Sequence, residues 1–98
     1  MAFEIEFSED AERHIRAMIA RDRAIVLDAI EQQLTHEPDV ATRHRKHLRP
    51  NPLADWELRV GDYRVFYSLE MDRGAVLVLA IGTKIHNTLT IEGKEYPL

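Results

Sequence analysis

The stretch Asp55–Tyr67, with the sequence DWELRVGDYRVFY, decides the fold of this chain. Apolar and charged residues alternate from Trp56 to Val60, which is the period of a half-buried strand. Gly61-Asp62 predicts a turn, because glycine tolerates a positive φ and aspartate hydrogen-bonds to nearby backbone. A second alternating run follows over Tyr63–Ser68. The stretch therefore predicts an antiparallel hairpin with one apolar face and one mixed face, and the mixed face carries Arg64.

The part of the chain before this hairpin predicts one strand and two helices. Apolar residues alternate with acidic ones over residues 3–7, which indicates a short strand. Ser8 is a favourable N-cap, and apolar residues follow at helical spacing over about residues 9–20. Asp22 is expected to cap a second helix, which Pro38 ends. The short connection between them predicts an antiparallel helical hairpin.

The remaining segments predict a loop, a central strand and a short tail. Residues 37–54 have no periodicity and contain three prolines, so we expect a connecting loop. Residues 75–81 form an unbroken apolar run, typical of a strand buried on both faces, which Gly82 is expected to end. The tail, residues 83–98, is either a small hairpin with a turn at Glu92-Gly93 or an ordered coil.

The order of these elements, β-α-α-β-β-β, predicts a single α+β domain over residues 1–98. The N-terminal strand and the helical hairpin are expected to pack on a mainly antiparallel, twisted sheet. Two helices are too few to cover both faces of such a sheet. We therefore expect the second face to be partly open, rimmed by the loop, and to serve as a substrate groove.

Composition narrows the class of protein. The chain has 98 residues, 45% of them hydrophobic, and no cysteine, which excludes disulfides and thiolate chemistry. The N-terminus is acidic and lacks the apolar core of a signal peptide. The longest apolar run is too short to span a bilayer. We expect a cytoplasmic protein with no membrane partner.

The net charge of −4 is unevenly distributed. Residues 1–42 carry four Arg or Lys against ten Asp or Glu, whereas residues 43–98 carry nine against seven. Residues 43–49 contain four cations and no acid, which predicts either a solvated loop or contact with RNA phosphates. These cations are Arg43, Arg45, Lys46 and Arg49. His44 and His47 have no carboxylate or cysteine close in sequence to complete a metal site, so we expect neither a metal nor another cofactor.

The segment Trp56–Tyr67, together with the element order, resembles the RelE/ParE family of bacterial type II toxins. Leu79–His86, with the sequence LAIGTKIH, resembles the family's last core strand and the residues that leave it. The resemblance covers nearly the whole chain and implies two possible activities. RelE-like members are ribosome-dependent mRNA endonucleases that cut without metal, by attack of a ribose 2′-OH on the adjacent phosphate. ParE-like members keep the fold and act on DNA gyrase.

The resemblance also implies roles for individual residues. Arg64 matches an arginine that contacts the scissile phosphate, and Lys84 lies near the position of a second phosphate-binding arginine. His86 resembles a histidine that some relatives use as an acid or base, and Glu57 is a further candidate for moving protons. The residues expected to hold the RNA backbone are Arg43, Arg45, Lys46, Arg49 and Arg59.

Three functions follow from the sequence. The first is a type II toxin that cleaves mRNA on the ribosome and so inhibits translation, a metal-independent endoribonuclease. The second is a gyrase-inhibiting toxin without nuclease activity, which two departures favour: Asp55 and Glu57 replace two lysines of RelE, and Thr90 lies nearest to its tail tyrosine. The third is an inert relative that only binds antitoxin. Each implies a cognate antitoxin as partner, with a heterotetramer as one form of the complex.

Overall fold

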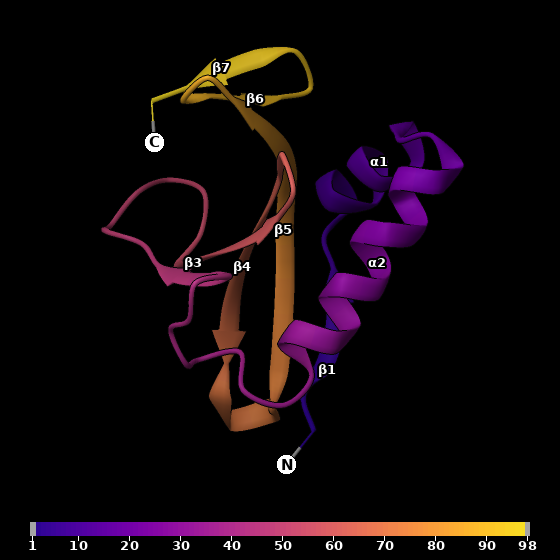
Figure 1. Cartoon of the computed structure of the whole chain (residues 1–98). Coiled ribbons are helices and arrows are strands. Elements are labelled where there is room, and N and C mark those ends of the chain that lie inside the picture. Colours follow the sequence, from indigo (N-terminus) through magenta and orange to yellow (C-terminus); the bar gives the residue numbers. More distant parts are fainter. Residues whose placement is uncertain (1, 98) are drawn as a thin grey trace.

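The computed structural model describes residues 2–97, which form two helices packed on one sheet (Figure 1). In chain order the elements are β1 (Glu4–Phe7), α1 (Glu9–Ala17), α2 (Ala20–Leu34), β2 (Arg45–His47), β3 (Trp56–Val60), β4 (Tyr63–Glu70), a 3-10 turn (Met71–Arg73), β5 (Ala75–Ile85), β6 (Thr88–Ile91) and β7 (Lys94–Tyr96). The predicted α+β class is confirmed. Within the described residues, neither helix has the length and apolar character needed to cross a membrane.

The sheet is mainly antiparallel and is built around β5. Its strand order is β2-β3-β4-β5-β6-β7, and β1 adds a parallel pair with the first part of β5. β3 and β4 pair in the register expected for a two-residue turn, with Val60 opposite Tyr63 and Gly61 at a φ of 59°. The predicted hairpin at Gly61-Asp62 is therefore confirmed, and it places Arg59 directly opposite Arg64.

Both helices cover the same face of the sheet, here called the helix face (Figure 1). Its core is a cluster of buried apolar side chains: Phe3, Ala11, Ile15, Val26, Ile30, Leu34, Trp56, Leu58, Val65, Tyr67, Val76, Val78 and Ile81. The hydroxyl of Tyr67 donates a hydrogen bond to the carbonyl of Pro38 at 2.7 Å. Because this bond satisfies a polar group inside an apolar cluster, it fixes the start of the loop after α2.

The opposite side of the sheet, here called the open face, has a smaller cluster of its own. Its buried residues are Ala54, Phe66, Ala80, Leu89 and Ile91. They are covered by the loop of residues 48–54 and by the β6–β7 hairpin rather than by helices (Figure 1). The register of β4 on β5 shifts between Phe66 and Tyr67, so that Leu79 is an extra residue and joins Ala80 on this face. The predicted open face is thus only partly uncovered.

The boundary between the helices differs from the prediction. α1 ends at Ala17 instead of residue 20, and α2 begins at Ala20, capped by Ile19 without a side-chain bond. Arg23 stabilises this early end, because its guanidinium donates to the carbonyls of Ile15 and Met18 at 3.2 and 2.9 Å. The predicted capping role of Asp22 is wrong.

Gly82 does not end the central strand, which continues to Ile85. A Cβ at position 82 would lie 2.5 Å from the Thr90 carbonyl oxygen and 2.6 Å from Cγ1 of Ile91. The glycine is therefore needed for the close approach of β6, and this approach lets the sheet continue.

Two expectations about irregular segments are also settled by the sheet. The segment of residues 37–54, expected to be only a loop, contains the edge strand β2, which pairs with β3. The tail adopts the hairpin alternative, with Glu92 and Gly93 at φ values of 51° and 78° between β6 and β7. Both additions extend the sheet at its two ends and bring polar side chains towards the open face.

Candidate functional site

A pocket of about 690 Å³ lies on the open face. It is bounded by β2, the loop that follows it, β5 and β7, and is lined by Lys46, His47, Leu48, Arg49, Pro50, Asn51, Pro52, Leu53, Glu57, Lys84, Tyr96 and Pro97. This hollow therefore combines three cations, one carboxylate and one phenol.

The sheet explains how these groups meet. Lys46 lies opposite Glu57 in the β2–β3 ladder, and side chains of paired residues share a face. On β5, Lys84 is two residues from Gly82, which lies opposite Arg64, so Lys84 shares the face of Arg64. Segments far apart in sequence thus direct positive charge into one hollow, where anions are attracted.

Glu57, which lines this pocket, forms a buried pair with Arg64, which lies behind it and is not among the described residues that line either hollow. Each is 8% exposed, and Arg64 Nε lies 3.9 Å from Glu57 Oε2. The Nη1 group donates to the carbonyls of Gly61 and Tyr63 at 2.8 and 2.9 Å, whereas Nε makes no hydrogen bond within residues 2–97. An unsatisfied buried donor is costly. The Nε–H of Arg64 is therefore a buried donor whose neighbouring charge is the carboxylate of Glu57.

A second hollow, of about 350 Å³, adjoins the first. The two share Lys46, His47 and Glu57, and the second adds Arg43, Arg45 and Arg59 to the positive charge. Together the two hollows form a track along β2 and β3 that is lined by cations and by the carboxylate of Glu57. A track of this kind suits an extended anionic chain better than a compact ligand.

The basic segment of residues 43–49 does not act as one surface. Arg45 lies opposite Leu58 and turns towards α2, where it donates to the carbonyls of Val40 and Gln33 at 2.9 and 2.8 Å. The ring of His47 packs 4.9 Å from that of Trp56. The strand alternation of β2 thus assigns Arg45 to the scaffold and leaves Lys46 for the open face.

Two further residues lie differently from what the sequence indicated. His86 is exposed in the β5–β6 turn at a φ of 52°, and is not among the described residues that line either hollow. Tyr96 lines the larger pocket, although no tyrosine was predicted there. The turn at Glu92-Gly93 and the β7 segment after it were the signals that could have placed Tyr96.

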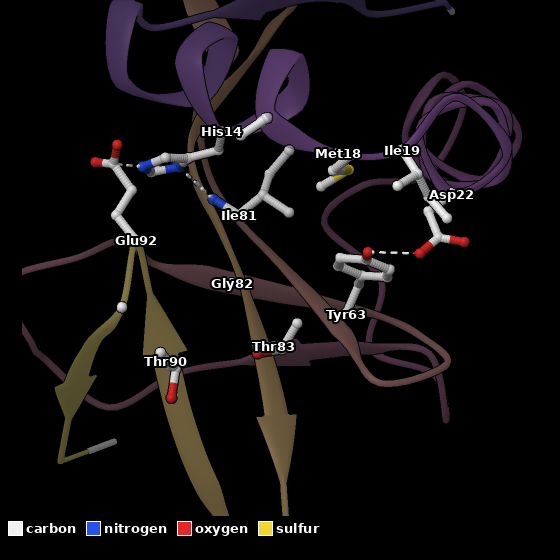
Figure 2. Close-up of a pocket in the computed structure, with 12 residues that line it drawn as sticks. His14, Met18, Ile19, Asp22, Tyr63, Ile81, Gly82, Thr83, Thr90 and Glu92 are labelled. Carbon is white, nitrogen blue, oxygen red and sulfur yellow. Dashed lines mark hydrogen bonds and ion pairs between the residues drawn. The ribbon is translucent and has the colours of Figure 1, made fainter.

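Another group missed by the sequence analysis lies on the helix side, in a hollow of about 370 Å³ (Figure 2). His14 is buried there and accepts a hydrogen bond from the Ile81 N–H at Nδ1, 3.0 Å away. At the other end, the Tyr63 hydroxyl donates to Asp22 at 2.8 Å, and this bond raises the pKa of Tyr63. His14 follows Ala11 at helical spacing, a signal that it shares the apolar stripe.

Glu92 anchors one end of that hollow. Its carboxylate accepts two bonds of 2.7 Å from Arg13 and lies 3.1 Å from Nε2 of His14. The bonds from Arg13, and secondarily that from His14, lower the pKa of Glu92 to about 2. Within residues 2–97, no group of three or more histidines and carboxylates is arranged to hold a metal ion.

Comparisons with known proteins agree with this fold. A family model described as the ParE toxin of the type II toxin–antitoxin system parDE matches residues 5–84. The chain is similar in structure to the toxin–antitoxin complex RelBE2 from Mycobacterium tuberculosis, with a TM-score of 0.70 and 23% identity over 85% of this chain and 99% of that one. It is also similar to the archaeal RelE–RelB complex from Pyrococcus horikoshii OT3, with a TM-score of 0.65 and 19% identity over 88% and 99%. No curated protein matches it.

Proposed function

This chain belongs to the ParE toxin family of type II toxin–antitoxin systems, and we propose that it is a cytoplasmic toxin that inhibits translation by cleaving mRNA on the ribosome. The observation that carries this proposal is the open-face pocket, which joins Lys46, Arg49 and Lys84 with Glu57 and Tyr96. Phosphodiester cleavage needs stabilisation of negative charge and two proton transfers. The groups of this pocket supply both.

The proposed reaction is an internal transfer within the RNA. The 2′-oxygen attacks the adjacent phosphorus, a new P–O bond forms, and the bond to the 5′-oxygen breaks. Glu57 accepts the 2′-OH proton, and Tyr96 donates a proton to the leaving 5′-oxygen. Arg64 and Lys84 stabilise the additional negative charge on phosphorus, with Arg64 exchanging the carboxylate of Glu57 for the phosphate. We assign the base to Glu57 because its carboxylate lines the pocket, whereas His86 does not.

The second hollow extends the same binding surface. Arg43, Lys46 and Arg59 line it, and Arg49 lines the larger pocket next to it. We assign to these residues the binding of RNA phosphates on either side of the cleaved bond, an interaction that weakens as salt rises. Arg45 supports this track indirectly, because it anchors β2 to α2 through the Gln33 and Val40 carbonyls.

A cognate antitoxin is the proposed protein partner. The two similar structures are complexes of toxin and antitoxin, and this chain matches 99% of the length of each matched chain. An antitoxin that covers the open face would mask its cations and prevent RNA from entering. A heterotetramer of toxin and antitoxin is the proposed resting form.

The experiment is induced expression in a bacterium without the antitoxin, followed by mapping of mRNA 5′ ends. We expect new ends at fixed positions within codons, absent when translation is blocked. Arg64→Ala and Tyr96→Phe should each reduce these ends by about 100-fold. The control is Arg16→Ala on α1, which removes an exposed arginine paired with Glu12 and should cleave normally.

Tyr96→Phe keeps the proposal falsifiable if Arg64→Ala fails to fold, because it removes only a hydroxyl group. Circular dichroism should give wild-type spectra for the variants that are compared. Intact messages during growth arrest would contradict the nuclease. Undiminished cleavage by both variants would contradict the assignment of the pocket.

A second candidate function is inhibition of DNA gyrase by binding. It is favoured by the arrangement of Arg64, whose Nη1 is already bonded to the Gly61 and Tyr63 carbonyls. The matching family model is that of a ParE toxin, and the family resemblance implies that ParE-like toxins act on gyrase. Growth arrest with induction of the DNA-damage response, without message cleavage, would support this alternative.

A further inference from the structure

The tip of the β6–β7 hairpin is attached to α1 through Glu92. Arg13 donates to Glu92 from Nε and Nη2, each at 2.7 Å, and its Nη2 also bonds to Asp10 at 3.0 Å. This guanidinium therefore connects the first turns of α1 to a turn 79 residues further along the chain. A two-bond arginine–carboxylate contact fixes orientation as well as distance.

His14 supplies the buried half of this attachment. Its side chain is 5% exposed, and its Nδ1 accepts the Ile81 N–H of β5. Since Nδ1 is an acceptor, the ring proton is on Nε2, which faces Glu92 Oε1 at 3.1 Å (Figure 2). The imidazole thus forms a bridge from the central strand to the hairpin tip.

The backbone conformation of the hairpin tip also indicates that the side chain of Glu92 is held in place. Glu92 has a φ of 51°, in the left-handed region that disfavours residues other than glycine, asparagine and aspartate. Two-residue turns of this kind prefer Asn-Gly or Asp-Gly, whereas this turn is Glu-Gly. A glutamate in this position is explained by its longer side chain, which reaches Arg13 and His14.

The hairpin needs such an attachment because its ladder is short. β6 pairs with β5 over three residues, and β7 has only β6 as its neighbour in the strand order. Tyr96 lies at the end of β7, where it lines the open-face pocket. Glu92 and Tyr96 also line one small hollow of about 270 Å³ between the start of α1 and the loop at residues 52–53. The tip and the phenol are therefore structurally adjacent.

We infer that Glu92, held by Arg13 and His14, is a positioning residue that fixes the β6–β7 hairpin and thereby holds Tyr96 in the open-face pocket. This inference rests on the proposed function, because it concerns the proton donor of the proposed cleavage. Glu92 does not contact the RNA; it acts by limiting the motion of Tyr96. Small displacements of a catalytic group lower the rate of reaction more than they lower binding.

The first test is a kinetic cycle with Glu92→Gln and Tyr96→Phe, measured as message cleavage on ribosomes. Glu92→Gln should lower kcat by about tenfold and change KM by less than about twofold. In the Tyr96→Phe background the same change should have no further effect, because the phenol through which Glu92 acts is gone. Equal losses in both backgrounds would overturn the inference and indicate general destabilisation.

The matched control is Glu95→Gln, which removes an exposed carboxylate from β7 of the same hairpin. It should cleave at the wild-type rate. If Glu95→Gln lowers kcat as much as Glu92→Gln does, the loss of a negative charge from the hairpin causes the effect, and not the loss of the attachment. The inference is then overturned.

The second test needs no nuclease activity. The chain contains three tyrosines, so fluorine-labelled tyrosine gives a simple NMR spectrum in which Tyr96→Phe identifies the Tyr96 signal. Glu92→Gln should shift or narrow that signal and leave those of Tyr63 and Tyr67 unchanged. An unchanged Tyr96 signal with normal cleavage overturns the inference alone. If Glu92→Gln changes the Tyr96 signal but the wild-type protein never cleaves RNA, the proposed function is overturned. The contribution of Glu92 to cleavage is then overturned with it, and only the attachment of the hairpin remains.

Discussion

The two faces of the sheet bury different kinds of side chain. The helix face is closed by two helices over a cluster of apolar residues, and its buried titratable side chains include those of His14 and Tyr67. The open face is covered by a loop and a short hairpin, and it buries Glu57 and Arg64 beside Phe66. Burying charge is costly unless the charge is used or compensated. The helix face is therefore the main source of stability, whereas the open face buries a charged pair at the site proposed for RNA.

The coverings of the two faces differ in the same way. The helix face is held by two continuous helices that bury Ile15, Val26, Ile30 and Leu34. On the open face, the short strands β2 and β7 flank the pocket, and their side chains remain accessible. Substitutions should therefore affect mainly stability on one face and mainly activity on the other.

The largest expected effect on stability comes from the helix face. Leu58→Ala removes a fully buried side chain, and we expect the free energy of unfolding to fall by about 3 kcal/mol. Leu53→Ala, on the half-buried cover of the open face, should cost about 1 kcal/mol. Chemical denaturation of both variants measures the difference. Equal losses would remove the distinction between the two faces.

A smaller loss of stability is expected for substitutions where the central strand β5 passes β6. Gly82→Ala forces a Cβ against the Thr90 carbonyl, and we expect a loss of about 2 kcal/mol. Gly61→Ala is the comparison, because no atom lies within 4 Å of its Cβ and only its positive φ costs energy, about 1 kcal/mol. Thermal melts of the two variants separate crowding from backbone strain. If Gly61→Ala were the more harmful change, the close approach of β6 would not matter.

The hydroxyl of Tyr67 should contribute about 1 kcal/mol, so Tyr67→Phe should lower the free energy of unfolding by that amount. Burial raises the pKa of Tyr67 above its usual value, so the neutral phenol is favoured in the folded state. Its stabilisation is complete below about pH 10 and is lost as the pH rises further. Denaturation at pH 8 and pH 11 should show that the free energy of unfolding of the wild type falls as the pH rises. The fall should be smaller in Tyr67→Phe. Parallel declines would contradict the buried environment.

The smallest effect is expected at the attachment of the hairpin. The pKa of Glu92 is lowered to about 2, mainly by Arg13, so its contribution to stability is complete above pH 4.5 and is lost as the pH falls towards 2. Glu92→Gln should therefore reduce the fall in melting temperature between pH 5 and pH 2.5. Glu95→Gln is the control and should behave as the wild type does. A wild-type acid profile in Glu92→Gln would show that the ion pair does not form in solution.

The elements that the sequence predicted correctly are those with local signals. The hairpin around Gly61-Asp62 has alternation on both sides and a turn residue with positive φ. Ser8 caps α1 as predicted, since its hydroxyl accepts the Ala11 N–H at 3.0 Å. Both features depend on residues within a few positions of each other, and such interactions can be recognised without knowing the fold.

The wrong expectations each involve a distant partner. Asp22 was expected to cap a helix, but it pairs with Tyr63, 41 residues away. Gly82 was expected to end a strand, but β6 requires its bare Cα. Tyr96 could be placed in the pocket only once the terminal hairpin was known. The sequence thus indicated which residues share the open face, and the sheet register determined which of them meet there.

The central claim, that RNA binds the open face, is tested most directly by photo-crosslinking in cells. A photoreactive phenylalanine derivative would replace Pro50, which is exposed at the rim of the pocket, or Ala24, which is exposed on α2. Induction without antitoxin and irradiation should then link position 50 to RNA and leave position 24 free of RNA. Crosslinks from position 50 to gyrase, or equal RNA crosslinks from both positions, would contradict the claim.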